Sequence, residues 1–161
     1  MRPDMQLLDL RDEVMMKPLA EVIAKHKLIL LIHASEPVGH EYPGKGVVTP
    51  EMLYPLITSF PDLIIVCAHW GGGLPFYALM PEVKQAMNNV FFDTAASPLL
   101  YSPQVYEQVI QLVGADKILF GSDYPLLAQS CLLKEISSLD LPEETKNLIL
   151  SGNAQRLLGI K

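Results

Sequence analysis

The sequence predicts an α/β fold in which strand–helix units repeat around a parallel sheet. Four apolar runs, rich in Ile, Leu, Val and Phe, are expected to be strands; they cover residues 28–35, 63–69, 89–97 and 117–123. Their cores lack the period-two alternation of half-exposed strands, which is typical of strands buried on both faces of a parallel sheet. Segments with helical spacing separate them at a pitch of roughly thirty residues, which indicates repeated βα units.

The intervening segments carry helix start and stop patterns. Thr49 and Pro50 supply a capping residue and an N1 proline before an apolar stripe, and residues 102–103 repeat this pattern before a helix that Gly114 ends. A further amphipathic stripe follows Pro18, and residues 142–152 and 153–159 form two more helical segments. No linker or low-complexity segment divides the chain, so we expect residues 1–161 to form a single domain.

The composition is that of a folded globular chain. Half of the 161 residues are hydrophobic (50%), 19% are charged, and the net charge is −6 with dispersed Lys and Arg. The apolar runs are much shorter than the roughly 18 residues that span a membrane, and the N-terminus lacks a signal-peptide core. Cys67 lies in an apolar run, where a reduced thiol is expected. We therefore expect a cytoplasmic protein with a small-molecule substrate and neither a nucleic-acid nor a membrane partner.

Polar side chains follow three of the predicted strands. His33, His69 and Asp123 each lie at or just beyond a strand end. In a parallel barrel or a doubly wound sheet, ligands bind at this carboxyl edge. Two imidazoles and a carboxylate there could ligate a divalent metal such as Zn²⁺. A histidine at a strand end is more often a hydrogen-bonded structural residue, and position alone leaves the two interpretations balanced.

The segment AHWGGG, residues 68–73, is an unusual way to end a buried strand. The three glycines allow a sharp turn and a close approach of a substrate to the backbone. We interpret His69 as an active-site residue at the end of its strand.

Four motifs together resemble the amidohydrolase superfamily, and more closely its branch with aminocarboxymuconate-semialdehyde decarboxylase and hydrolase relatives. They are HASEPVGHEYPGKG (33–46), AHWGGG (68–73), FGSDYP (120–125) and GNAQRLLG (152–159). The resemblance spans nearly the whole chain, and the motifs follow the family's order. It implies a TIM-barrel type (β/α)₈ fold with a divalent metal, usually zinc. A full barrel takes about 250 residues, so the chain is expected to hold about four βα units, corresponding to strands 5–8, the C-terminal half.

The resemblance also assigns roles to individual residues. His33 matches a metal-ligating histidine after the fifth strand, and His69 matches the histidine that positions or deprotonates the metal-bound water. Asp123 matches an aspartate that is both metal ligand and proton-transfer group. The family's first strand supplies two further ligands as His-x-His, which is absent here, since the histidines are His26, His33, His40 and His69. We therefore expect weak metal binding by the chain alone.

The implied activity is that of a metal-dependent hydrolase, in which metal-activated water attacks a small substrate bearing a carbonyl or carboxylate. The alternatives are a nonoxidative decarboxylase of the same branch and a catalytically inactive scaffold or interaction module. The expected substrate-binding residues are Glu36, His40, Lys45, Trp70 and Tyr124. For the loop after His33, a plain solvated role is an equal alternative. Phe76 is expected in the core, and Asp93 is expected to make a structural hydrogen bond.

Half a barrel would leave its first and last strands with unpaired edges and its inner face uncovered. We therefore expect a homo-oligomer, or association with the missing N-terminal half of the barrel.

Overall fold

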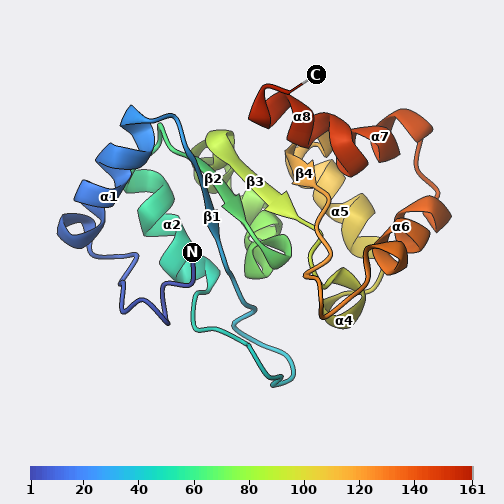
Figure 1. Ribbon diagram of the computed structural model, residues 1–161, viewed down its shortest axis with the longest axis horizontal. Coiled ribbons are helices and arrows are strands. Elements are labelled where there is room, and N and C mark those ends of the chain that lie inside the picture. Colours follow the sequence, from blue (N-terminus) through green and yellow to red (C-terminus); the bar gives the residue numbers. More distant parts are fainter. Residues whose placement is uncertain (161) are drawn as a thin grey trace.

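The protein forms a four-stranded parallel sheet with helices around it (Figure 1). The computed structural model describes residues 1–160. The strands are β1 (Ile29–Ile32), β2 (Ile64–Cys67), β3 (Val90–Asp93) and β4 (Ile118–Leu119), and they lie in the order β1-β2-β3-β4. All three neighbouring pairs are parallel. The predicted α/β class, strand order and direction are confirmed.

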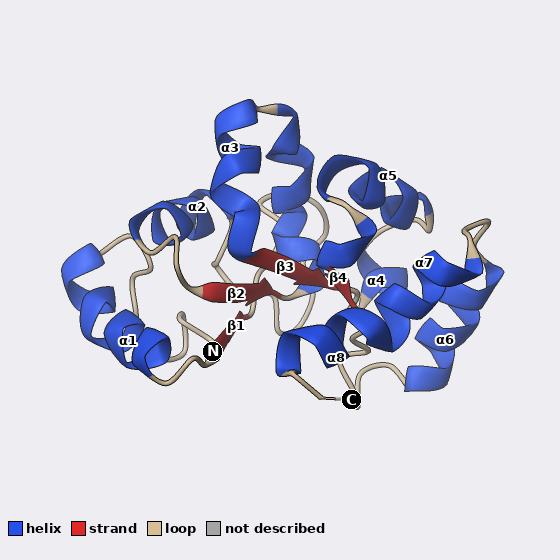
Figure 2. Ribbon diagram, turned by 90° about the horizontal axis from the view of Figure 1, so that it is seen from above, coloured by secondary structure: helices blue, strands red, loops and turns tan. Residues whose placement is uncertain are grey.

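The helices form the outer layer of the molecule. Figure 2 shows α2, α3 and α5 along one side of the sheet, with α1 beside β1 and α8 beside β4. The bounds are α1 (Glu13–Lys25), α2 (Pro50–Ser59), α3 (Pro81–Ala86), α4 (Ser97–Leu100), α5 (Gln104–Val113), α6 (Gln129–Ser138), α7 (Glu143–Asn147) and α8 (Asn153–Leu158). Short 3₁₀ segments are η1 (His69–Leu79), η2 (Met87–Asn89) and η3 (Ala115–Lys117), and a π turn, η4 (Leu148–Gly152), joins α7 to α8. No helix within residues 1–160 combines the length and apolarity needed to cross a membrane.

The two faces of the sheet have different surroundings. Ile32, Cys67, Phe92 and Ile118 form one row across the strands, and all four are fully buried in the core beneath the helices. The neighbouring row, Leu31–Val66–Phe91, alternates with it and therefore points to the other face. Leu31 is 49% exposed there. Both faces are apolar, which explains why the strands show no alternation in the sequence.

The elements differ from their predicted bounds mainly at the carboxyl edge of the sheet. Each strand ends before the predicted apolar run does, because the backbone there pairs with loops: the Ser35 N–H donates to the Val48 carbonyl, and the Gly121 N–H donates to Thr94 Oγ1. Helix α1 starts earlier than predicted and contains Pro18, since the Asp12 side chain caps it by accepting the Met15 N–H. Helix α6 was not predicted.

Candidate functional site

The residues after β2 form a left-handed turn. The φ angles of His69, Trp70, Gly71 and Gly72 are 55°, 55°, 59° and 59°, a region that residues with a Cβ rarely adopt. A Cβ on Gly72 would lie 2.3 Å from the Ser35 carbonyl oxygen, and one on Gly71 would lie 2.9 Å from the Phe92 ring. The space at Gly71 and Gly72 therefore requires glycine, and the left-handed φ favours it.

Two side chains hold this turn in place. Asp93 Oδ1 accepts the backbone N–H groups of His69 (2.9 Å) and Ala95 (3.0 Å), which confirms its predicted structural hydrogen bonding. Burial raises the pKa of Asp93. The Trp70 indole N–H donates to Ser97 Oγ at 3.0 Å, and its ring packs edge-on against Tyr106 with centroids 5.0 Å apart.

The same geometry corrects the prediction for Trp70. Its side chain is fully buried, because the left-handed turn directs the indole into the core while His69 faces the carboxyl edge. Trp70 anchors the turn and cannot form a wall for a substrate.

The hydrogen bonds of His69 assign its proton. Nδ1 lies 3.0 Å from the Ala95 carbonyl oxygen, which can only accept, so Nδ1 carries the hydrogen. Nε2 lies 3.2 Å from Nδ1 of His33, so the two imidazoles are hydrogen-bonded to each other. Burial, with smaller contributions from His69 and Arg2, lowers the pKa of His33 to about 4. His33 is therefore neutral near pH 7.

A cavity of about 480 Å³ opens at the carboxyl edge, and His33, His69 and Asp123 all line it. The sequence placed these three side chains at one edge, and the structure brings them together around one space. Of the five predicted substrate-binding residues, His40 also lines it. The remaining lining residues are Arg2, Tyr42, Pro43, Gly44, Ala96, Leu99, Leu100 and Leu126.

Three other predicted substrate-binding residues lie outside this cavity. Glu36 faces a neighbouring hollow, and its carboxylate accepts the Tyr42 hydroxyl hydrogen at 3.2 Å. Lys45 Nζ donates to the Glu41 carboxylate at 3.0 Å, and Lys45 does not line the cavity. Tyr124 is 70% exposed and points to solvent. Phe76, expected in the core, is 39% exposed and lies beside Tyr101.

Sequence reasoning missed Arg2 and Tyr42. Arg2 reaches the cavity because Met1 pairs with β1: the Met1 ammonium donates to the Leu31 carbonyl at 2.6 Å, and the His33 N–H donates to the Met1 carbonyl at 2.9 Å. Met1 and Arg2 are too short a segment to show a strand pattern, so the sequence does not indicate that Met1 pairs with β1. Tyr42 lies in the loop that was identified as a substrate wall, and only its partner Glu36 was singled out.

The described residues do not form a complete metal site. Within residues 1–160, no three His, Cys, Asp or Glu side chains come close enough together to hold a metal ion. His33 and Asp123 line the same cavity but are only two donors, whereas a zinc site normally has at least three protein ligands. The chain by itself therefore does not fit a bound metal, in line with the absence of a His-x-His pair.

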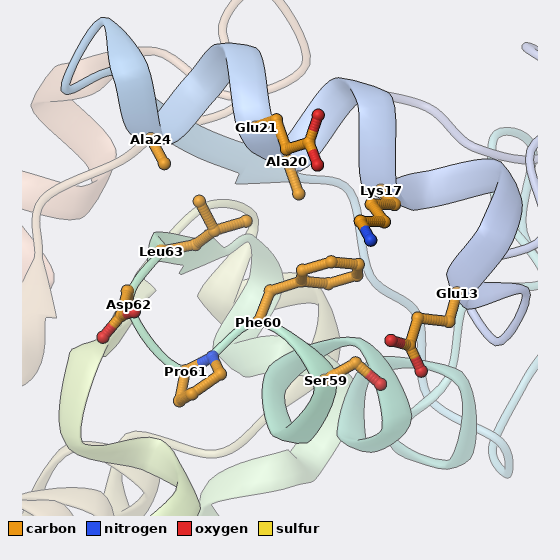
Figure 3. Close-up of a pocket in the computed structure, with 10 residues that line it drawn as sticks. All are labelled: Glu13, Lys17, Ala20, Glu21, Ala24, Ser59, Phe60, Pro61, Asp62 and Leu63. Atoms are coloured by element: carbon orange, nitrogen blue, oxygen red, sulfur yellow. The ribbon is translucent and has the colours of Figure 1, made fainter.

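A second groove, of about 300 Å³, lies between α1 and the segment that joins α2 to β2 (Figure 3). Phe60, Ala20 and Leu63 form its apolar part, and Lys17 and Glu21 extend from α1 above them. Because this segment leads into the amino end of β2, the groove is at the opposite edge of the sheet from His69. Its lining contains neither an imidazole nor a thiol, and it shares no residue with the cavity in which His33, His69 and Asp123 meet.

Parallel barrels carry their active sites at the carboxyl edge of the strands, the edge at which His33, His69 and Asp123 meet here. The family model described as Amidohydrolase matches residues 1–160, and the chain belongs to this family.

Named relatives define the similarity further. The chain is 27% identical over 174 residues to the 6-methylsalicylic acid decarboxylase of Penicillium expansum, covering 88% of this chain and 53% of that protein. The structure of 5-carboxyvanillate decarboxylase from Sphingomonas paucimobilis is similar with a TM-score of 0.73 and 22% identity, over 89% of this chain and 53% of that one. A dihydroxybenzoic acid decarboxylase from Polaromonas sp. JS666, with bound manganese, gives a TM-score of 0.71 at 19% identity, over 88% and 53%.

The chain spans about half the length of the relatives that it matches. The structural neighbours are TIM-barrel proteins, so the four-stranded sheet corresponds to half of such a barrel. This confirms the predicted fold class.

Proposed function

We propose that this chain is half of a cytoplasmic nonoxidative decarboxylase that acts on small aromatic carboxylates. The observation that carries the proposal is the cavity in which His33, His69 and Asp123 meet, in a chain whose named relatives are decarboxylases of aromatic acids. The hydrolase activity expected from the sequence has no such support among these relatives. They favour the alternative, decarboxylation.

The reaction replaces a carboxylate on an aromatic ring by hydrogen. The bond between the ring carbon and the carboxylate breaks, CO₂ leaves, and the ring carbon keeps the electron pair and takes up one proton. Asp123 is the proposed group that transfers the proton to the ring carbon, because among the described residues it is the one carboxyl group that lines the cavity. His69 lines the same cavity, and both of its ring nitrogens are hydrogen-bonded, Nδ1 to the Ala95 carbonyl and Nε2 to Nδ1 of His33. We propose that His69 orients the substrate together with His33.

A divalent metal is part of this proposal, with zinc as the expectation from the sequence and manganese as the ion bound in related structures. When bound, such an ion polarises and orients an oxygen-bearing substrate group. We propose that His33 and Asp123 contribute two donors and that the remaining ligands come from outside residues 1–160.

The proposed partner is a second half-barrel. It supplies the missing ligands and covers the open face of the sheet, either as a segment equivalent to the N-terminal half of the relatives or as a second copy of this chain.

Complementation tests the function. The chain is co-expressed with the N-terminal half of the Penicillium expansum decarboxylase, supplied with Mn²⁺ or Zn²⁺, and assayed for CO₂ release from 6-methylsalicylate. We expect release only from the combined sample, and its loss in the Asp123→Asn and His69→Ala variants. His26→Ala is the matched control, because His26 ends α1 and does not line the cavity, and it should retain activity.

Two other outcomes contradict the proposal. If the combined sample hydrolyses an ester or amide of the acid and releases no CO₂, the hydrolase interpretation is correct. If the halves copurify with bound metal and neither reaction occurs, the chain is an inactive scaffold, which the incomplete ligand set of the chain alone favours.

A further inference from the structure

We propose that Arg2 binds the carboxylate of the substrate in the cavity at the carboxyl edge. This inference rests on the proposed function and names the group that recognises the substrate's charge.

The backbone places Arg2 at the edge where His33 lies. Met1 donates to the Leu31 carbonyl and accepts from the His33 N–H, at 2.6 Å and 2.9 Å. One residue that bonds in this way to both neighbours of Ile32 has the pairing of a parallel strand. Met1 therefore occupies a strand position on the free side of β1, and Arg2, the next residue, emerges beside His33 at the carboxyl edge.

Arg2 is the one permanently charged cation among the described residues that line the cavity. To a carboxylate, the guanidinium offers both opposite charge and hydrogen-bond donors. An anionic substrate in this space therefore has Arg2 as its electrostatic partner from this chain.

Asp4 fixes the guanidinium and leaves part of it free. The Arg2 side chain donates from Nε to Asp4 Oδ1 at 3.3 Å and from Nη2 to Asp4 Oδ2 at 3.0 Å. The remaining nitrogen, Nη1, has no hydrogen-bond partner among residues 1–160. The Arg2 side chain is 39% exposed, so this nitrogen can reach a ligand. Asp4 is a positioning residue in this arrangement.

The experiment compares two probes that differ in charge, salicylate and its neutral amide, salicylamide. Binding to the full chain is measured by NMR titration at low ionic strength. We expect Arg2→Gln to weaken salicylate binding by about tenfold or more, the usual effect of losing a charge-assisted hydrogen bond. Salicylamide binding should change less than about twofold, since it carries no charge for the guanidinium to recognise.

Arg11→Gln is the matched control. Arg11 is paired with Asp9 through the same two nitrogens, Nε and Nη2, at 2.9 Å each, but does not line the cavity. It should leave the binding of both probes unchanged, and Arg2→Lys should retain part of the salicylate affinity. Amide spectra of each variant show whether the Met1 pairing with β1 persists.

Equal loss of both probes in Arg2→Gln, or equal salicylate affinity in Arg2→Gln and the unaltered chain, would overturn the inference. The same holds if the unaltered chain does not prefer salicylate to salicylamide. Because binding needs no turnover, a chain that binds salicylate through Arg2 while complementation yields no CO₂ would uphold this inference and refute only the proposed function.

Discussion

At the scale of single residues, the position of His69 depends on Gly72, which has no side chain. The turn that presents this imidazole is left-handed, and at Gly72 it passes so near the loop after β1 that a Cβ would lie 2.3 Å from the Ser35 carbonyl oxygen. That oxygen belongs to the backbone and cannot rotate away. The turn and the segment that carries His33 would have to separate.

We therefore expect Gly72→Ala to lower the free energy of unfolding by about 2–4 kcal/mol. Gly159→Ala is the control, because Gly159 has a similar φ of 65° but no atom within 4 Å of the added Cβ. Gly159→Ala should lower the free energy of unfolding by only about 1 kcal/mol, the cost of placing a Cβ at a left-handed φ. Urea unfolding of both variants measures the difference, and equal losses would show that the close approach to Ser35 has no effect.

The side chain of Asp93 also stabilises the turn that carries His69. Its Oδ1 accepts two backbone N–H groups, those of His69 and Ala95, in a buried position. Asp93→Ala leaves both donors without a partner and should destabilise the protein by about 2–4 kcal/mol. Asp93→Asn keeps an acceptor oxygen in place and should lose less than half as much. Thermal unfolding compares the two, and an Asn variant as unstable as the Ala variant would mean that the carboxylate charge is what matters.

Metal binding at His33 and Asp123 should be weak in the isolated chain. Two donors fall short of the three protein ligands usual for zinc, and residues 1–160 contain no larger group. Competition with a chromophoric chelator should give a zinc dissociation constant above about 1 μM, far weaker than structural zinc sites. Stoichiometric zinc that survives dialysis against the chelator would reveal ligands beyond these two; His69 and His40 also line the cavity.

At the scale of elements, the sheet can be probed through its one buried thiol. Cys67 ends β2 and is fully buried, whereas Cys131 in α6 is exposed, and both are free. Burial, together with the nearby charge of Asp93, raises the pKa of the Cys67 thiol, so its reactive thiolate is scarce. Native protein should react with a thiol reagent at one site only, and Cys131→Ser should abolish that reaction. Rapid labelling of Cys67 without denaturant would show that the helices do not cover β2.

The elements also show what the sequence could reveal and what it could not. The strands and their order were predictable because burial on both faces leaves a continuous apolar run. His33, His69 and Asp123 were predictable because parallel strands bring their carboxyl ends to one edge. The role of Arg2 was not, since it depends on a pairing between Met1 and β1 that crosses 30 residues.

The sequence did not predict the burial of Trp70 or the presence of helix α6, for two different reasons. The glycines indicated a turn but not that its backbone is left-handed. The handedness decides whether the indole of Trp70 or the imidazole of His69 faces the core. Helix α6 follows Ala128, which makes no side-chain cap, so no start pattern marked it.

At the scale of the whole molecule, the face of the sheet that carries Leu31 is open to solvent and favours self-association. Strands β1 and β4 each have one strand neighbour, and Leu28 and Leu31 are 52% and 49% exposed beside the free side of β1. Met1 occupies only the carboxyl end of that side. Exposed apolar side chains next to unpaired backbone groups favour association with another sheet.

We therefore expect the isolated chain to self-associate at micromolar concentration, and Leu31→Glu to shift it to monomer, because a carboxylate on this face would have to be buried without a partner. Val22→Glu is the matched control: Val22 is 51% exposed, but it lies on α1 and not on the sheet. That variant should associate like the unaltered chain. Sedimentation velocity over a hundredfold concentration range gives the state of each. A monomeric unaltered chain at the highest concentration would show that the open face is stable in water, and association lost equally in both variants would place the contact on the helices.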